Sequence, residues 1–392
     1  MPLLLHLSDV HLGARHADLA HAATTQRERQ LAALGRAVDV GLERKVDVTL
    51  ISGDLFDSNT QPRRVVEQAA NEFKRLTDAG IRVVIIPGTH DVYDRASIYR
   101  AFDLAAMVGL APGSDLLTVL TPDMPELLID ELDLLVVGRV FDTKRAPRSP
   151  LAGLSLRGDE RAGWKVGMVH GSRHIPGRVE KDDVLFTDAE IAASELDYLA
   201  LGHWHSFSEG RAGSTTWAYP GAPEPLAVDQ HGAGSVCIVH VEDGAGDGSS
   251  VRVERVEIGR TVFRTEPIDA ASIESQEVLV ERLRELVDKD LILHVEIAGI
   301  AADTLEIDTA AVEQELGPSF LHVRVRDASI SEVDSAEAPP EDTVAGRFIA
   351  VLEQRIREAE GTGDDAAAEQ ARAVLRLGRQ LLLDDPDRVT LV

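Results

Sequence analysis

Aspartate and histidine residues that could ligate metal ions recur in five short motifs. In chain order these are Ser8-Asp9-Val10-His11-Leu12-Gly13, Gly53-Asp54-Leu55-Phe56-Asp57, Gly88-Thr89-His90-Asp91, Val169-His170-Gly171 and Gly202-His203-Trp204-His205. Side chains two positions apart in extended backbone point the same way, so Asp9 and His11 can converge on one ion. His203 and His205 repeat this spacing.

Carboxylates and imidazoles supply oxygen and nitrogen ligands, a set that suits Mn²⁺, Fe or Zn. A carboxylate that bridges two such ions would let them lie about 3.5–4 Å apart, which suits a clamp on the attacking and leaving oxygens of a phosphoryl displacement. The flanking glycines permit tight turns and a close approach of the backbone to a ligand. The motifs therefore predict metal-assisted hydrolysis of a phosphate ester.

Apolar runs typical of strands precede the motifs. Strands are predicted at Leu3–Ser8, Val46–Ser52, Ile81–Pro87, Leu134–Val140, Trp164–His170, Asp197–Gly202, Ser235–Val241 and Val251–Ile258, and helices at Thr24–Arg44 and Arg63–Ala79. Continuous apolar strands separated by helical lengths indicate an α/β sheet covered on both faces, with at least its first part parallel. Open α/β sheets bind ligands beyond the carboxyl ends of their strands, where all five motifs lie.

The composition changes near Thr265. A helix at Glu277–Lys289 and strands at Leu291–Ile297 and Phe320–Val325 predict a small α/β domain over residues 266–330. Residues 335–342 have the composition of a linker, and two helices are predicted after it, at Thr343–Glu358 and Ala366–Leu383. The predicted organisation is a domain over 1–260, a small domain over 266–330 and a helical segment over 343–392.

The 67 acidic and 40 basic residues give a net charge of −27. A field of this sign repels phosphate at long range and excludes a broad basic surface for nucleic acid. Salt screens that field over about 8 Å, so a local cationic site, or bound metal ions, could still hold a phosphodiester. The single cysteine and the lack of an apolar stretch of about 18–20 residues predict a cytoplasmic protein without membrane contact.

In order and spacing, SDVHLG, GDLFD, GTHD, VHG and GHWH resemble the motifs of the calcineurin-like metallophosphoesterases. The later YPGAPE segment, residues 219–224, and the small trailing domain make the chain similar to SbcD and the Mre-type nucleases of double-strand-break repair complexes. The resemblance implies a metallophosphoesterase-like sheet core covered by helices on both faces, followed by a small α/β cap domain and C-terminal helices.

The resemblance also implies a site with two divalent metal ions, with Mn²⁺ expected first and Fe, Zn or Mg²⁺ as alternatives. Asp9, His11 and His205 would hold one ion. Asp54 would bridge, and His170 would hold the second ion. His203 also belongs to this metal shell.

Two further residues of the third motif have roles by resemblance. His90 matches a histidine that contacts the scissile phosphate and assists the leaving group. Asp91 would orient its imidazole. Asp57 could support the metal shell or cap the following turn.

Threonine at position 89 departs from the Gly-Asn-His-Asp pattern of the family. The asparagine of that pattern ligates the second metal, and Thr89 offers one hydroxyl oxygen in its place. The second ion could therefore bind less tightly, or water could replace the lost ligand.

The leading hypothesis is a metal-dependent phosphodiesterase that hydrolyses DNA, either at ends or in single strands. One alternative is a phosphodiesterase for nucleotides or other small diesters, and another is a non-catalytic adaptor for DNA ends or an ATPase. By resemblance, residues 266–330 would cap the cleft and the segment after them would dock an SbcC-like coiled-coil ATPase. A homodimer is also expected.

Overall fold

The computed structural model describes residues 1–243, 249–302, 305–331, 339–340 and 342–362, with isolated residues between 364 and 382. Contacts along the chain divide it into two units, Met1–Val262 and Phe263–Val392. Across these described ranges, no helix combines the length and the hydrophobicity needed to span a lipid bilayer.

A six-stranded sheet begins the first unit, in the order β14-β13-β1-β2-β3-β4. Its strands are β1 (Leu3–Leu7), β2 (Val48–Ser52), β3 (Arg82–Ile86), β4 (Leu117–Val119), β13 (Ser235–Asp243) and β14 (Ser249–Glu257). Strands β1 to β4 run parallel, whereas β13 pairs antiparallel with β1 and β14. Cys237 of β13 is buried opposite His6, and burial raises the pKa of its thiol.

A second six-stranded sheet has the order β11-β12-β10-β7-β6-β5. Its strands are β5 (Glu126–Ile129), β6 (Leu134–Arg139), β7 (Trp164–His170), β10 (Tyr198–Gly202), β11 (Ser208–Ala212) and β12 (Thr215–Tyr219). The central strands β6, β7, β10 and β12 run parallel to one another, whereas the outer strands β5 and β11 are antiparallel to β6 and β12. The carboxyl ends of the four parallel strands therefore lie at the same end of the sheet. The carboxyl ends of β1, β2 and β3 likewise lie together at one end of the first sheet.

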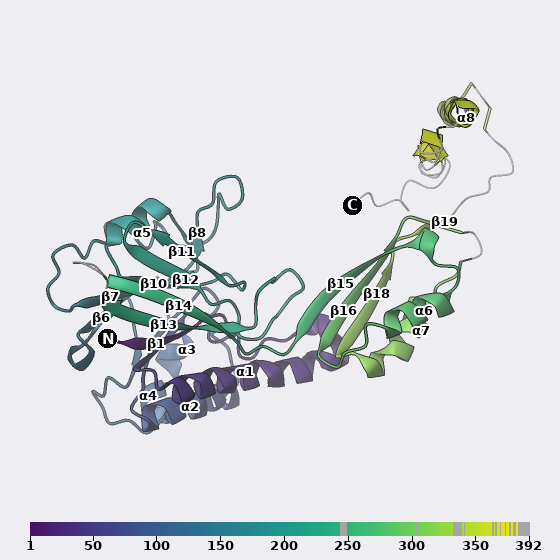
Figure 1. Cartoon of the computed structure of the whole chain (residues 1–392). Coiled ribbons are helices and arrows are strands. Elements are labelled where there is room, and N and C mark those ends of the chain that lie inside the picture. The colour runs from purple at the N-terminus through teal and green to yellow at the C-terminus, as the bar shows by residue number, and fades with distance from the viewer. Residues whose placement is uncertain are drawn as a thin grey trace. The chain divides into compact units, whose positions relative to one another are not determined.

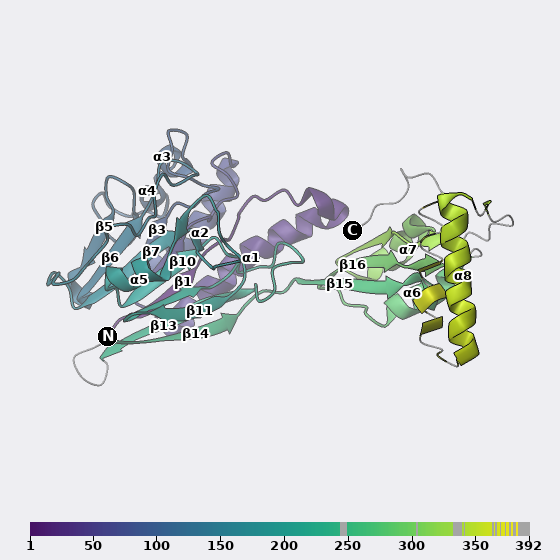
Figure 2. The ribbon, with the colours of Figure 1, turned by 90° about the horizontal axis from the view of Figure 1, so that it is seen from above.

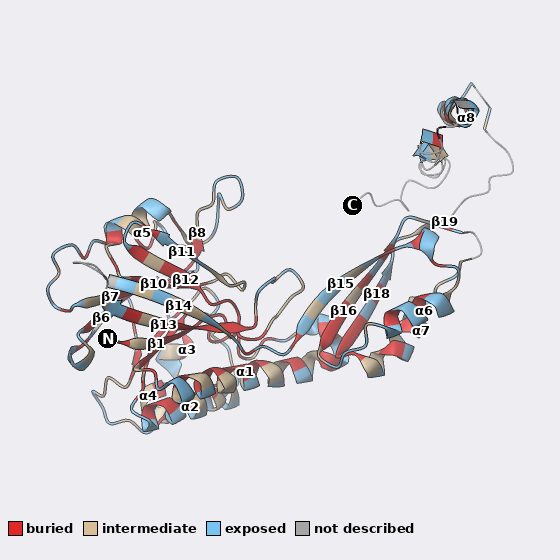
Figure 3. Cartoon of the chain, viewed as in Figure 1, coloured by how far each residue is buried: buried red, intermediate tan, exposed pale blue. Residues whose placement is uncertain are grey.

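The two sheets face each other across a shared apolar core (Figures 1 and 3). Leu50 and Val84 of the first sheet and Val166 and Ala200 of the second belong to it. Helices α1 (Ala23–Arg44) and α2 (Arg63–Asp78) pack on the outer face of the first sheet, and α5 (Asp188–Ser194) packs on the second. The predicted α/β core with helices on both faces is confirmed, with two facing sheets at its centre.

The second unit contains the sheet β15-β16-β18, with strands β15 (Val262–Asp269), β16 (Leu291–Ala298) and β18 (His322–Asp327). Helices α6 (Gln276–Arg284) and α7 (Thr309–Leu316) lie beside this sheet (Figure 2). They contribute Leu279, Leu283 and Val312 to the apolar core that they share with it. The predicted helix over 277–289 ends earlier, at Arg284, where single turns lead into β16. Whether this unit caps the cleft stays a prediction.

The last described helix is α8 (Val344–Thr362), which agrees with the prediction over 343–358. Its apolar side chains Ile349 and Leu352 are buried. Half of the predicted helix over 366–383 lies outside the described residues, and the residues of it that are described are helical.

A buried carboxylate ties the end of the first unit to α1. Glu224 is 2% exposed and accepts hydrogen bonds from the backbone N–H groups of Arg260 and Thr261 at 3.1 Å and 2.6 Å. Its other oxygen lies 2.7 Å from the guanidinium of Arg36 on α1. The carboxylate therefore fixes residues 260–261 against the helix.

Replacing Glu224 with alanine should destabilise the first unit by about 3 kcal/mol, because it leaves a half-buried guanidinium and two backbone donors without their acceptor. Thermal unfolding measures this loss. Glu257→Ala is the control, since the Glu257 side chain is 78% exposed and its substitution should change stability by about 0.5 kcal/mol or less. Equal melting temperatures for the two variants would contradict the assignment.

Candidate metal centre

Backbone hydrogen bonds join the loops that follow the neighbouring strands β1 and β2. The N–H of Asp9 donates to the carbonyl of Gly53 at 3.1 Å, and the N–H of His11 donates to the carbonyl of Asp54 at 3.0 Å. Asp9, His11 and Asp54 have left-handed φ angles of 56°, 50° and 52°. Such backbone is costly for residues other than glycine and persists where surrounding contacts impose it, commonly at functional sites.

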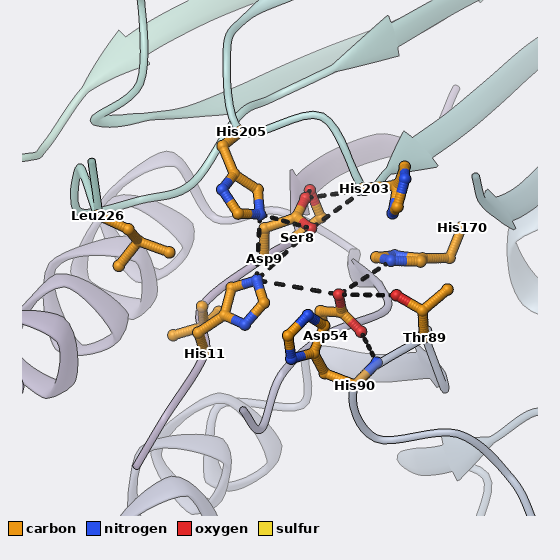
Figure 4. A network of polar contacts seen from close by, with 12 residues as sticks. Ser8, Asp9, His11, Asp54, Thr89, His90, His170, His203, His205 and Leu226 are labelled. Carbon is orange, nitrogen blue, oxygen red and sulfur yellow. Dashed lines mark hydrogen bonds and ion pairs between the residues drawn. The ribbon is translucent and has the colours of Figure 1, made fainter. Parts of the chain in front are cut away.

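One group of potential ligand atoms comes from the first and last motifs. It contains Asp9, His11 and His205, whose ligand atoms all lie within 4.8 Å of one another (Figure 4). The Nε2 atoms of His11 and His205 are 3.1 Å apart, and that of His205 is 3.7 Å from the Asp9 carboxylate. Asp9 is fully buried and accepts the backbone N–H of His203 at 3.0 Å.

A second group contains Asp54, His170 and His203. Nε2 of His170 lies 3.0 Å from Oδ2 of Asp54, while its Nδ1 contacts the carbonyl of Ser52 at 2.9 Å. The same Asp54 oxygen is 3.8 Å from Nε2 of His11 in the first group. Asp54 therefore lies between the two groups, and its role as a bridging ligand, which the resemblance implies, stays a prediction.

The electrostatics of the site favour a bound cation. Burial by itself would lower the pKa of His170, but the charge of Asp54 and its hydrogen bond outweigh burial and raise that pKa to about 10. Burial would raise the pKa of Asp54, yet the nearby histidines hold it well below its usual range. In the metal-free protein a proton on His170 thus balances the carboxylate. A divalent cation supplies the same compensating charge, and carboxylate and imidazole donors suit Mn²⁺, Fe or Zn.

Three glycines permit this close packing. A Cβ atom at Gly53 would lie 2.4 Å from Nδ1 of His170, and one at Gly88 would lie 2.2 Å from the carboxylate of Asp54. A Cβ atom at Gly202 would lie 2.0 Å from the carbonyl oxygen of Ser52. Each of these glycines is the first residue of a predicted site motif, so the motifs need glycine for space as well as for turns.

His90 stands at the open side of the site, with its side chain 49% exposed. Its Nδ1 lies 3.0 Å from the carbonyl oxygen of Asp57 and 3.8 Å from the Asp57 carboxylate. The same carboxylate is 3.5 Å from Nδ1 of His11. Asp57 therefore supports both imidazoles.

The expectation that Asp91 orients the imidazole of His90 is corrected by these contacts. Asp91 is fully buried, and its carboxylate accepts hydrogen bonds from the backbone N–H groups of Gly88 and Phe56 and from the hydroxyl of Tyr99. It holds the loops that carry His90 and Asp57. Although the two residues are adjacent in the sequence, the imidazole of His90 contacts Asp57 and not the buried carboxylate of Asp91.

Thr89 lies beside the second group, with Oγ1 3.4 Å from Oδ2 of Asp54. A hydroxyl at this distance fits a neutral ligand or a hydrogen-bond donor to the carboxylate. Its assignment as a ligand stays a prediction.

Two residues that contact the site carry no sequence signal. Nε2 of His203 lies 3.2 Å from the carboxylate of Asp182, and Nδ1 of His205 lies 2.5 Å from the side-chain amide of Gln230. Asp182 and Gln230 lie in loops between motifs, without a recognisable pattern around them. Contacts of this kind orient metal-binding imidazoles.

Residues 2–207 match the family described as Calcineurin-like phosphoesterase. The match covers all five motifs. It therefore spans the whole candidate metal centre.

Curated relatives share part of this sequence. A protein named DNA double-strand break repair protein Mre11 from Aeropyrum pernix is 30% identical over 234 residues, 59% of this chain and 55% of that protein. A protein of the same name from Methanopyrus kandleri is 25% identical over 354 residues, 86% of this chain and 73% of that protein. Uncharacterized metallophosphoesterase YhaO from Bacillus subtilis is 24% identical, over 61% of this chain and 57% of that protein.

Gly53→Ala should remove bound metal, because its Cβ atom would displace the imidazole of His170 and the backbone at Gly88. The metal content of purified protein measures this effect. Gly80→Ala is the matched control: Gly80 has a similar φ of 79° but nothing within 4 Å of an added Cβ. The control should lose about 1 kcal/mol of stability and keep its metal. Equal metal loss in both variants would refute the steric argument.

Thr89→Asn should tighten binding of the more weakly held divalent ion by about tenfold, because an amide oxygen is a stronger ligand than a hydroxyl. Titration calorimetry with Mn²⁺ measures the two sites. Thr89→Ala separates the roles of the hydroxyl. Weaker binding in that variant would support Thr89 as a ligand, whereas unchanged binding would show that its hydroxyl does not hold the metal.

Proposed function

The chain belongs to the calcineurin-like phosphoesterase family, a family of hydrolases with a dinuclear metal site, and we propose that its substrate is DNA. The observation that carries this proposal is the similarity to two proteins named for DNA double-strand break repair, over 59% and 86% of this chain. The chain covers about half of one of these relatives and about three quarters of the other.

The position of Asp54 between the two ligand groups supports a reaction centre beside this carboxylate. Divalent ions bound there, with Mn²⁺ proposed first, would supply Lewis acidity that activates water and neutralises charge on the phosphate. Asp9, His11 and His205 would bind on one side of Asp54, and His170 and His203 on the other. The fixed loops hold these groups before substrate arrives, which lowers the cost of reorganisation during the reaction.

His90 provides the proton that the leaving oxygen needs. Its Nδ1 faces the carbonyl of Asp57, so Nε2 remains for a substrate oxygen on the exposed side of the ring. An imidazolium in this position hydrogen-bonds the phosphate and protonates the departing 3′ oxygen. Asp57 keeps the ring in place.

A protein partner would bind at α8. Val344 and Val351 of this helix are 80% and 47% exposed, while its other face buries Ile349 and Leu352. A coiled-coil ATPase of the SbcC type is the proposed partner, as the resemblance implies. Pairing with a second copy of the chain is a separate proposal of the same origin.

Asp54→Asn should abolish Mn²⁺-dependent cleavage of single- and double-stranded DNA, because it weakens the ligand between the two metal groups. His90→Ala should retain bound metal but cut about 10²–10⁴-fold more slowly, the usual contribution of an acid–base group. Gel assays of labelled DNA, with metal content measured in parallel, test both variants. Chelation should abolish cleavage by the unmodified protein, and Mn²⁺ should restore it.

The same assays separate the alternatives. Turnover of bis(p-nitrophenyl) phosphate without cleavage of any DNA would replace the proposal with a small-diester phosphodiesterase. Folded, metal-loaded protein that hydrolyses neither substrate would indicate an adaptor. Full DNA cleavage by Asp54→Asn would contradict the mechanism.

A further inference from the structure

A short basic segment follows β6 in this strongly acidic chain. Residues 139–148 contain Arg139, Lys144, Arg145 and Arg148 against one acidic residue, Asp142, whereas the whole chain has a net charge of −27. Because exposed charges are screened over about 8 Å, such a local cluster can attract an anion despite the overall charge.

Two arginines of this segment line one cavity. It has a volume of about 210 Å³, and Arg139 and Arg148 share its wall with Gly138, Phe141 and three prolines, Pro122, Pro125 and Pro150. The walls combine rigid backbone with two guanidinium groups. A phosphate group is small enough for this space.

Among the described residues, the side chain of Arg139 makes no ion pair and no hydrogen bond. Its Nε is buried without a hydrogen bond, and burial, followed by the nearby charge of Arg148, lowers the pKa of Arg139 against the opposing effect of Glu126. No ion pair joins Arg139 or Arg148 to a carboxylate in the part of the chain that the structure describes. A half-buried guanidinium without an acceptor is costly, and a bound anion would relieve that cost.

The cavity lies at the carboxyl ends of the strands of the second sheet, as the metal centre does. Arg139, the last residue of β6, pairs with Val169 of β7, the residue before His170. The following loop is also bonded to the loop after β7, through the N–H of Ala146 at 2.8 Å and the guanidinium of Arg145 at 2.9 Å, both on Asp183. The preceding residue, Asp182, contacts His203.

We propose that Arg139 and Arg148 bind a backbone phosphate of the DNA strand, away from the phosphodiester that reacts at the metal centre. The inference rests on the proposed function, since it names a second contact for the same substrate. Guanidinium groups bind phosphate oxygens through paired, charge-assisted hydrogen bonds. The contact carries no sequence preference and fixes where the strand lies.

Binding without cleavage tests the inference directly. Fluorescence anisotropy with a labelled single-stranded oligonucleotide is measured in chelator, at several salt concentrations, for Arg139→Gln and Arg148→Gln. Each variant should bind about tenfold more weakly, with a salt slope lower by about 0.7, the value for one lost phosphate contact. Arg211→Gln is the matched control, because Arg211 is exposed on β11 at the opposite edge of the same sheet.

Cleavage provides the second measurement. With Mn²⁺, the ratio of DNA cleavage to bis(p-nitrophenyl) phosphate hydrolysis should fall in both variants, through a higher KM for DNA. Binding equal to that of Arg211→Gln would overturn the inference, as would a wild-type protein that binds no DNA. An equal loss of both hydrolytic activities would also overturn it, because the arginines would then act on the metal centre.

The proposed nuclease function can fail separately. Wild-type protein that binds the oligonucleotide through Arg139 and Arg148 but cuts no DNA would refute nuclease activity and support the phosphate site. Inorganic phosphate that displaces the oligonucleotide at micromolar concentration would identify a site for free phosphate and overturn the inference.

Discussion

The carboxylate of Asp54 is the point on which the geometry of the site depends. It is buried, its backbone is left-handed, and it lies within 3.0 Å of His170 and 3.8 Å of His11. That position requires two sheets whose strands end at the same place and glycines that let neighbouring loops come within contact distance. The site therefore depends directly on the fold, because any movement of the strand ends would separate the two groups of ligand atoms.

The strands and the five motifs could be predicted from the sequence because apolar runs and glycine-flanked acidic and imidazole residues are local signals. The strand predicted at Trp164–His170 has the same bounds as β7. The direction of a side chain after a turn depends on tertiary contacts that the sequence does not reveal. The sequence therefore assigns to Asp91 the contact with His90 that Asp57 makes in the structure. Asp182 and Gln230 reach the site from loops without periodicity. No pattern in the sequence could have indicated them.

The first unit contains all the candidate chemistry, and its family determines the class of reaction. Substrate choice depends instead on surfaces around the metal centre, which vary more freely than the sheets that support them. The net negative charge of the chain makes these local surfaces more important, because it gives a polyanion such as DNA no long-range electrostatic attraction to the protein. A DNA strand would have to be held by a few local contacts, among which metal ions and unpaired guanidinium groups are the strongest available.

Cys237 is the chain's single thiol and lies buried in β13, next to β1 in the first sheet. Burial keeps disulfide reagents away from this thiol. Burial also raises the pKa of the thiol, which lowers the fraction of thiolate, the reactive form. Its modification rate consequently reports how often this part of the sheet opens to solvent. The rate at which Cys237 is modified therefore measures local unfolding beside β1, the strand that leads into the first metal-binding motif.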